Sequence, residues 1–228
     1  MSKKNWREWA FLFGMFGAVQ FAILTSIAMF FYGGGTIVDP NAPGYTFWAN
    51  FFSDLGRTRA LSGRDNTVSY IMFTITLILG SIFGIISTIA FYYFFTEVKL
   101  EKRLSIISTI LLVISGILHV GIALTPWDIY YEEHVIFVEI SSLTSLIGGF
   151  LYVYVIFHNK TFTNKIGYVI IVQLVLGLIW IMILILLRPD PSTTNGLILH
   201  CVNQKIGVYV GLVSNFYISY ISWKKIKT

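Results

Sequence analysis

Long apolar stretches alternate with short charged segments along the whole chain. Six stretches of about 20 residues carry at most one charge each, at positions 9–32, 68–95, 104–125, 135–157, 166–187 and 206–223. A helix of this length crosses the hydrocarbon core of a bilayer and pairs its own backbone N–H and C=O groups. The pattern therefore predicts an all-α fold, a six-transmembrane-helix bundle that forms a single transmembrane domain over residues 1–228. The sixth helix could begin earlier, near Gly196.

The composition excludes a soluble domain. Apolar residues make up 56% of the 228 residues and charged residues only 12%, about half the charged fraction of a typical soluble domain. The formal net charge of +5 lies in short runs between the apolar stretches, so we expect no nucleic-acid partner. Cys201 is the only cysteine, which excludes an internal disulfide and a cysteine-based zinc site.

The distribution of Lys and Arg predicts the orientation of the chain. Eleven of these residues fall on the side that holds both termini, and five fall on the other side: Arg57, Arg59, Arg64, Arg188 and Lys205. Basic connections tend to stay in the cytoplasm, so we expect a multi-pass protein of the cell membrane with both termini cytoplasmic. The connection at 33–67 is then a long outer loop, a kind that is more often functional than idle. The two cytoplasmic connections are short and basic, which is typical of simple hairpin turns.

Three histidines are expected near the outer ends of their helices. His119 lies at the end of the third span, His134 begins the fourth and His200 precedes the sixth. Three imidazoles could hold a zinc ion with an open position for water, as a metal-dependent hydrolase requires. Each histidine lies on a different helix and no HExxH, HxxxH or HxxE pattern is present. The sequence therefore leaves their convergence open.

A second hypothesis concerns recognition of an anionic headgroup. Arginines at the outer boundary, above all Arg57, Arg64 and Arg188, could bind a phosphate or carboxylate while the apolar helices hold acyl chains. Asp54 and Asn66 would complete such a headgroup site. In the alternative, the arginines pair with neighbouring aspartates and only fold the loop.

Glu139 is the only charged residue well inside a predicted span. An ionisable group at membrane depth is costly and is by default a functional candidate. Glu139 could be the relay of a proton-coupled transporter, or could act in catalysis with Asp128 and His134. The alternative is a structural role, either as an ion pair with a partner such as Arg188 or Lys205 or as a protonated, hydrogen-bonded carboxyl.

Two short motifs resemble a prokaryotic family of six-span membrane proteins. The first is Asn50-Phe51-Phe52-Ser53-Asp54-Leu55-Gly56 followed by Asn66. The second is Gly121-Ile122-Ala123-Leu124-Thr125-Pro126-Trp127-Asp128 followed by His134. That family is in turn similar to the eukaryotic DRAM and FRAG group, some members of which act in autophagy or in remodelling of GPI-lipid anchors. The resemblance implies a six-helix fold with an elaborated first outer loop and a link to lipid metabolism, and it supplies no reaction.

Local rules give these motif positions physical roles. Pro126 lacks an N–H and disfavours helix at the residue before it, so we expect the third helix to end at Thr125. Ser53 and Asp54 can close a turn that folds the loop back against the bundle. Asp128 can form a turn or cap toward the fourth helix.

The leading hypothesis is a membrane protein that binds or processes a lipid or another amphiphile from the outer leaflet, with membrane lipids as its partners. Its headgroup site would comprise Arg57, Arg64, Asp54, Asp128 and His134. The rivals are the proton-coupled transporter and the metal-dependent hydrolase, in which zinc is held by His119, His134 and His200. The sequence alone does not separate an enzyme from a binding protein.

Overall fold

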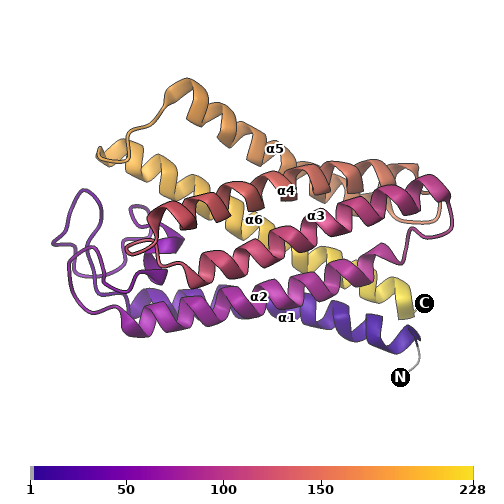
Figure 1. Cartoon of the computed structure of the whole chain (residues 1–228), viewed down its shortest axis with the longest axis horizontal. Coiled ribbons are helices and arrows are strands. Elements are labelled where there is room, and N and C mark those ends of the chain that lie inside the picture. Colours follow the sequence, from indigo (N-terminus) through magenta and orange to yellow (C-terminus); the bar gives the residue numbers. More distant parts are fainter. Residues whose placement is uncertain (1–2, 228) are drawn as a thin grey trace.

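The computed structural model describes residues 3–227, and for residues 3–5 the backbone alone. Six long helices form an elongated bundle (Figure 1). They are α1 (Lys3–Phe30), α2 (Thr67–Tyr92), α3 (Lys99–Leu124), α4 (Tyr131–His158), α5 (Asn164–Leu187) and α6 (Thr194–Lys227), and a short 3-10 helix, η1 (Phe52–Gly56), lies between the first two. All six long helices are long and apolar enough to cross a membrane. The predicted six-helix bundle of a multi-pass membrane protein is therefore confirmed.

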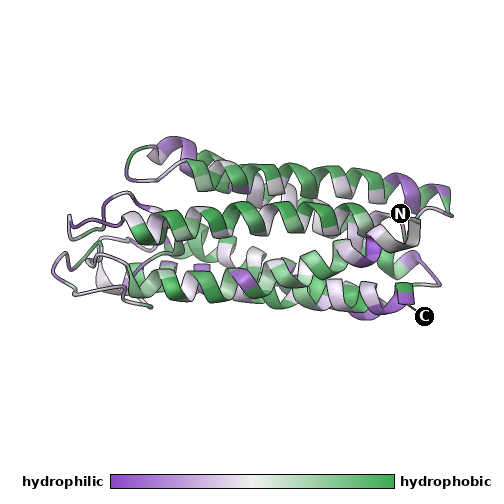
Figure 2. Cartoon of the chain, turned by 90° about the horizontal axis from the view of Figure 1, so that it is seen from below, coloured by the Kyte–Doolittle hydropathy of each residue, from purple (hydrophilic) through white to green (hydrophobic). Residues whose placement is uncertain are grey.

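The bundle has two polar ends joined by apolar helices (Figure 2). One end, here called the loop end, carries the segment 31–66, the α3–α4 connection and the α5–α6 connection. The opposite end, here called the termini end, carries both chain termini with the α2–α3 and α4–α5 connections. The side chains of Lys3 and Lys4, which count toward the predicted charge asymmetry, lie outside the described part of the chain.

The helices contact one another in chain order, and α6 closes the ring against α1. The contacts of α5 with its two neighbours are the sparsest in this ring, and α5 diverges from α4 toward the loop end (Figure 1). Hydroxyl side chains link neighbouring helices. Ser108 donates to the carbonyl of Gly148 at 2.6 Å, and Ser87 and Ser219 share a hydrogen bond of 3.2 Å. Such small polar contacts are expected where lipid removes the hydrophobic preference for a helix neighbour.

Local chemistry explains several helix ends. α3 ends at Leu124, directly before the Thr125-Pro126 pair, as predicted. α5 begins after Thr163, whose side-chain oxygen accepts from the backbone N–H of Lys165 at 3.4 Å. The chain leaves α5 through Arg188, which has a φ of 44° in the left-handed region, and so reverses direction into the short α5–α6 connection.

The sixth helix begins much earlier than position 206. α6 starts at Thr194, close to the alternative start near Gly196, and it includes His200 and Lys205. The prediction that Lys205 belongs to the outer connection is therefore wrong. The polar run between these two residues lowers the local hydropathy, although the helix continues through it.

Gly14 of α1 lies at a contact of three helices. A Cβ there would touch Ser219 Oγ and lie only 2.7 Å from Ser87 Oγ and 2.9 Å from Ser87 Cβ. We expect Gly14→Ala to lower the free energy of unfolding by about 1–3 kcal/mol through overpacking, as measured by unfolding in detergent. Gly84→Ala is the matched control, because nothing lies within 4 Å of a Cβ at Gly84. Equal losses in the two variants would contradict this packing.

Candidate functional site

Two buried asparagines fold the segment 31–66. Asn50 donates from Nδ2 to the carbonyl of Gly35 at 2.9 Å. Asn66 accepts from the N–H of Gly33 at 3.3 Å and donates to the carbonyl of Arg57 at 2.8 Å. These side chains satisfy backbone groups that would otherwise be buried without a partner. The amide of Asn66, expected in a headgroup site, is thus engaged in the fold of the segment.

Asp54 lies in η1 and is fully buried. Its Oδ2 accepts from Asn50 Nδ2 at 3.0 Å and from the N–H of Phe51 at 2.8 Å. Its Oδ1 is buried without a hydrogen-bond partner among the described residues. Burial raises the pKa of the Asp54 carboxyl to about 6, against the opposing effects of these two hydrogen bonds and of the nearby cations Arg57 and Lys205. The chain turns here as predicted, but the carboxyl is sealed from solvent.

Lys205 is a buried cation that links α6 to the segment 31–66. Its side chain is only 2% exposed, and its Nζ donates to the carbonyl of Asn50. The Nζ also lies 5.1 to 5.5 Å from the centroids of three aromatic rings, those of Tyr45, Phe47 and Phe52. Cation–π attraction to these rings offsets part of the cost of burying the charge. Sequence reasoning missed this role because it placed Lys205 outside the helix.

Asp128 joins the α3–α4 connection to the segment 31–66. Its carboxylate accepts from the N–H of Thr58 at 3.1 Å, from Thr58 Oγ1 at 2.7 Å and from the N–H of Arg59 at 3.1 Å. Partial burial raises the pKa of Asp128, but these hydrogen bonds outweigh it, so the pKa lies below its usual value. Of the expected turn or cap, the turn is confirmed, because Asp128 lies in the turn between α3 and α4. The cap is wrong, because the carboxylate binds backbone 70 residues earlier in the chain instead of the start of α4.

The three candidate zinc ligands are directed at three different carbonyl groups. His119 Nδ1 lies 2.8 Å from the oxygen of Ser115, one turn earlier in α3. His134 Nδ1 lies 2.7 Å from the oxygen of Thr125, and His200 Nε2 lies 2.9 Å from the oxygen of Pro189. Within residues 3–227, no group of three His, Cys, Asp or Glu could hold a metal ion. The structure does not bring these histidines together, and His134 instead joins the start of α4 to the end of α3.

The arginines of the loop end do not pair with aspartates. In the described part of the chain, the basic and acidic side chains within 4 Å of each other are His158 and Glu101 at the termini end, which form an ion pair when His158 is protonated. Arg57 instead donates from Nε to the carbonyl of Arg59 at 3.1 Å, and its guanidinium lies 5.2 Å from the ring centroid of Trp127. Arg64 and Arg188 are exposed, as is Arg59. The alternative in which arginine–aspartate pairs fold the loop is therefore not seen.

Glu139 is exposed on α4. Neither Arg188 nor Lys205 forms an ion pair with it, and no hydrogen bond to its side chain is formed by the described residues. The structural ion pair expected for this residue is thus absent from the described part of the chain. Its roles as a relay or in catalysis remain hypotheses.

No family model, curated protein or solved structure matches this chain. The resemblance to the six-span family and to the DRAM and FRAG group therefore rests on the two short motifs alone. In the structure, Asn50 and Asn66 from these motifs fold the segment 31–66, and Asp128 and His134 connect it and α4 to neighbouring backbone. The fold places the chain in a class, that of multi-pass helical membrane proteins.

We expect Asp54 to make the stability of the loop end depend on pH. Because burial raises its pKa from 3.8 to about 6, the folded chain binds this proton more tightly than the unfolded chain does. The carboxyl therefore favours folding most below about pH 4, and this contribution is lost as the pH rises through about 6. Unfolding measured across this range should show that Asp54→Asn removes the dependence.

The control for this experiment is Asp39→Asn, because Asp39 is an exposed aspartate of the same segment. It should keep the pH dependence of the wild-type protein. If the Asp54→Asn protein followed the wild-type profile instead, the buried carboxyl could not be its source.

Proposed function

We propose that this protein binds an anionic amphiphile, of the phospholipid type, from the outer leaflet of the cell membrane. One observation carries the proposal: within the described residues, no arginine of the loop end has a carboxylate within ion-pair distance. These arginines are Arg57, Arg59, Arg64 and Arg188. A guanidinium offers parallel N–H donors that match the oxygens of a phosphate.

Arg57 is the best positioned of these cations. Its Nε bond to the carbonyl of Arg59 and its contact with Trp127 hold the guanidinium over the ring. Fixing a long side chain before a ligand arrives reduces the conformational entropy lost on binding. Trp127 also has the chemistry preferred at a membrane interface, with an apolar ring and a polar N–H.

The neighbouring polar residues support the arginines indirectly. Asp128 accepts hydrogen bonds from Thr58 and Arg59, and Asn66 donates to the carbonyl of Arg57. These bonds fix the backbone that carries two of the four arginines. We therefore infer that Asp54, Asn66, Asp128 and His134 shape the binding face without contacting the ligand.

Apolar side chains next to the arginines suit acyl chains. Arg188 directly follows the last turn of α5, where Ile185, Leu186 and Leu187 are all well exposed. A headgroup at Arg188 would leave its acyl chains along this apolar surface. We propose an amphiphilic ligand because the exposed apolar end of α5 lies directly beside the cation Arg188.

The outward orientation of the loop end belongs to the same proposal. With Lys205 counted inside α6, four basic residues remain in the connections of the loop end against eleven at the termini end. This asymmetry favours cytoplasmic termini.

Cysteine labelling tests this orientation. In a Cys201→Ala background, Asn41→Cys at the loop end should react with a membrane-impermeant maleimide on intact cells. Lys102→Cys at the termini end should react only after permeabilisation; both native side chains are exposed. The opposite result would place the arginines in the cytoplasm and overturn the outer-leaflet proposal.

Lipid binding is tested by native mass spectrometry of the detergent-extracted protein titrated with phosphatidylglycerol. We expect Arg57→Gln with Arg64→Gln to weaken binding of one lipid by roughly 10- to 30-fold, since a basic residue near an anionic lipid contributes about 1 kcal/mol. Lys102→Gln with Arg103→Gln removes the same charge from exposed positions of the termini end. Unchanged lipid binding in the arginine variant, or an equal loss in the control, would refute the proposal.

A further inference from the structure

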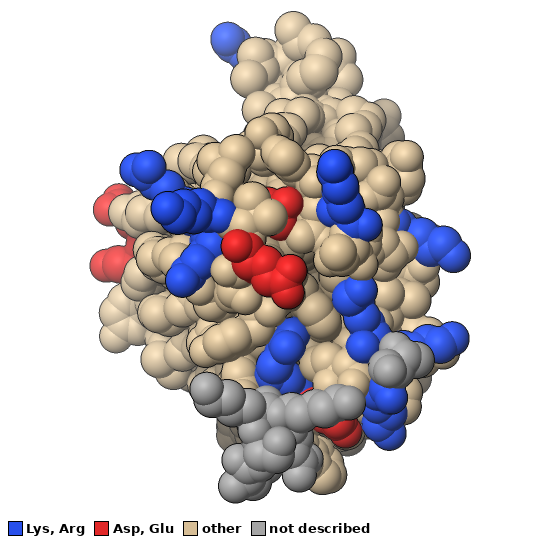
Figure 3. Space-filling view, turned by 90° about the vertical axis from the view of Figure 1, so that its right-hand side faces the viewer, with Lys and Arg blue, Asp and Glu red and all other residues tan. Residues whose placement is uncertain are grey.

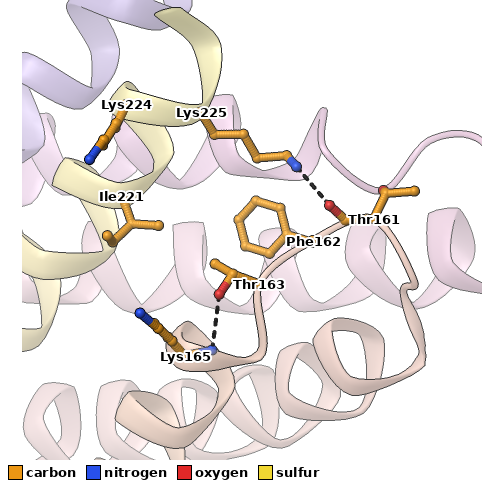
Figure 4. Close-up of a pocket in the computed structure, with 7 residues that line it drawn as sticks. All are labelled: Thr161, Phe162, Thr163, Lys165, Ile221, Lys224 and Lys225. Atoms are coloured by element: carbon orange, nitrogen blue, oxygen red, sulfur yellow. Dashed lines mark hydrogen bonds between the residues drawn. The ribbon is translucent and has the colours of Figure 1, made fainter. Parts of the chain in front are cut away.

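A pocket lies at the termini end, between the α4–α5 connection and the last turns of α6. It has a volume of about 420 Å³ and is lined by Thr161, Phe162, Thr163, Lys165, Ile221, Lys224 and Lys225. Figure 4 shows Phe162 in the middle of this group, with lysines from both segments around it. The pocket is thus formed by residues 161–165 and 221–225, which lie far apart in the sequence.

The pocket is strongly basic. Three of its lining residues are lysines, and none of those that belong to the described residues 3–227 is acidic. It also adjoins the first turn of α5, where backbone N–H groups give the helix a partial positive charge. Lys and Arg predominate across this end of the molecule (Figure 3). A ligand that fits this pocket therefore carries negative charge.

The α4–α5 connection that forms one wall is held from two sides. Asn159 accepts from the N–H groups of Thr161 and Phe162 at 3.0 and 2.8 Å, and its own amide donates to the buried carboxylate of Glu101. From the other side, Lys225 Nζ donates to the carbonyl of Thr161 at 2.7 Å. Hydrogen bonds within the chain thus hold the wall in place, which reduces the cost of ordering it on binding.

Phe162 gives the pocket an apolar base. Its ring packs against those of Phe91, Phe94 and Phe95, with centroids 4.9 to 5.6 Å apart, and Ile221 adds an aliphatic side chain to the lining. Lys225 Nζ lies 5.4 Å from the centroid of the Phe162 ring. A cation over an apolar ring, at the end of membrane-spanning helices, matches a lipid phosphate joined to its glycerol. Basic pockets between transmembrane helices commonly bind such headgroups.

We propose that this pocket binds the phosphate of an anionic phospholipid from the leaflet at the termini end. The three lysines among the described lining residues favour a lipid of net negative charge over phosphatidylcholine and phosphatidylethanolamine, whose headgroups each add a cationic ammonium group. The site is at the opposite end of the bundle from the four arginines, so it does not depend on the proposed function.

The experiment is a titration of the full chain with phosphatidylglycerol, followed by native mass spectrometry. To exclude the loop end, it is performed with the Arg57→Gln and Arg64→Gln changes already present. Adding Lys165→Gln, Lys224→Gln and Lys225→Gln should weaken lipid binding by roughly 100-fold. The corresponding Lys→Arg triple variant should retain it, because the positive charge is kept.

The matched control changes three exposed lysines of the same end that do not line the pocket, Lys99, Lys102 and Lys160, to Gln. It should bind phosphatidylglycerol as the parent does. Equal loss in both triple variants would show a diffuse charge effect and overturn the proposal. So would equal binding of phosphatidylcholine, or displacement of the lipid by an equal concentration of inorganic phosphate, which would identify a site for the free anion.

Discussion

The structure depends on satisfying backbone hydrogen bonds where a long irregular segment covers the end of a membrane bundle. The helices satisfy their own backbone, but the segment 31–66 cannot. Asn50, Asn66 and Asp128 supply the missing partners, each with several hydrogen bonds to loop backbone. Without the two asparagines, the segment would bury unpaired C=O groups, each at a cost of about 1–3 kcal/mol.

This use of polar side chains determines the electrostatics of the loop end. Asp128 is occupied by backbone N–H groups and Asp54 is buried in η1, so neither neutralises an arginine through an ion pair. Lys205, in contrast to the arginines, is buried beneath the same segment, where aromatic rings and a backbone carbonyl surround its ammonium group. The cations are thereby divided into one that holds the fold together and four that face the surroundings.

The six helices could be predicted from the sequence because each is recognised from one continuous stretch of the chain, by its length and its lack of charged residues. The start of α6 was ambiguous, because a polar run interrupts the apolar pattern: the start at 206 is too late, whereas the alternative near Gly196 is close to Thr194. His200, Gln204 and Gly207 share one helical face in this stretch, which favours the earlier start. The roles of Asp128 and His134 were not predictable in the same way. Asp128 binds Thr58 across 70 residues, and residue spacing carries no information about such a contact. The basic pocket likewise needs Thr161 and Lys225, 64 residues apart.

In the middle of the bundle, polar side chains link neighbouring helices, whereas at both ends they include the cations that could bind a ligand. Ser108 and Ser115 donate to carbonyl groups of α4, and Ser87 bonds to Ser219 of α6. These hydroxyls are used for helix association, which is their common role in lipid. Cationic side chains, in contrast, gather at the two ends, where water and headgroups lower the cost of a charge. Recognition of a charged ligand by this fold is therefore expected at the ends, through arginines on an irregular segment at one and lysines between two helices at the other.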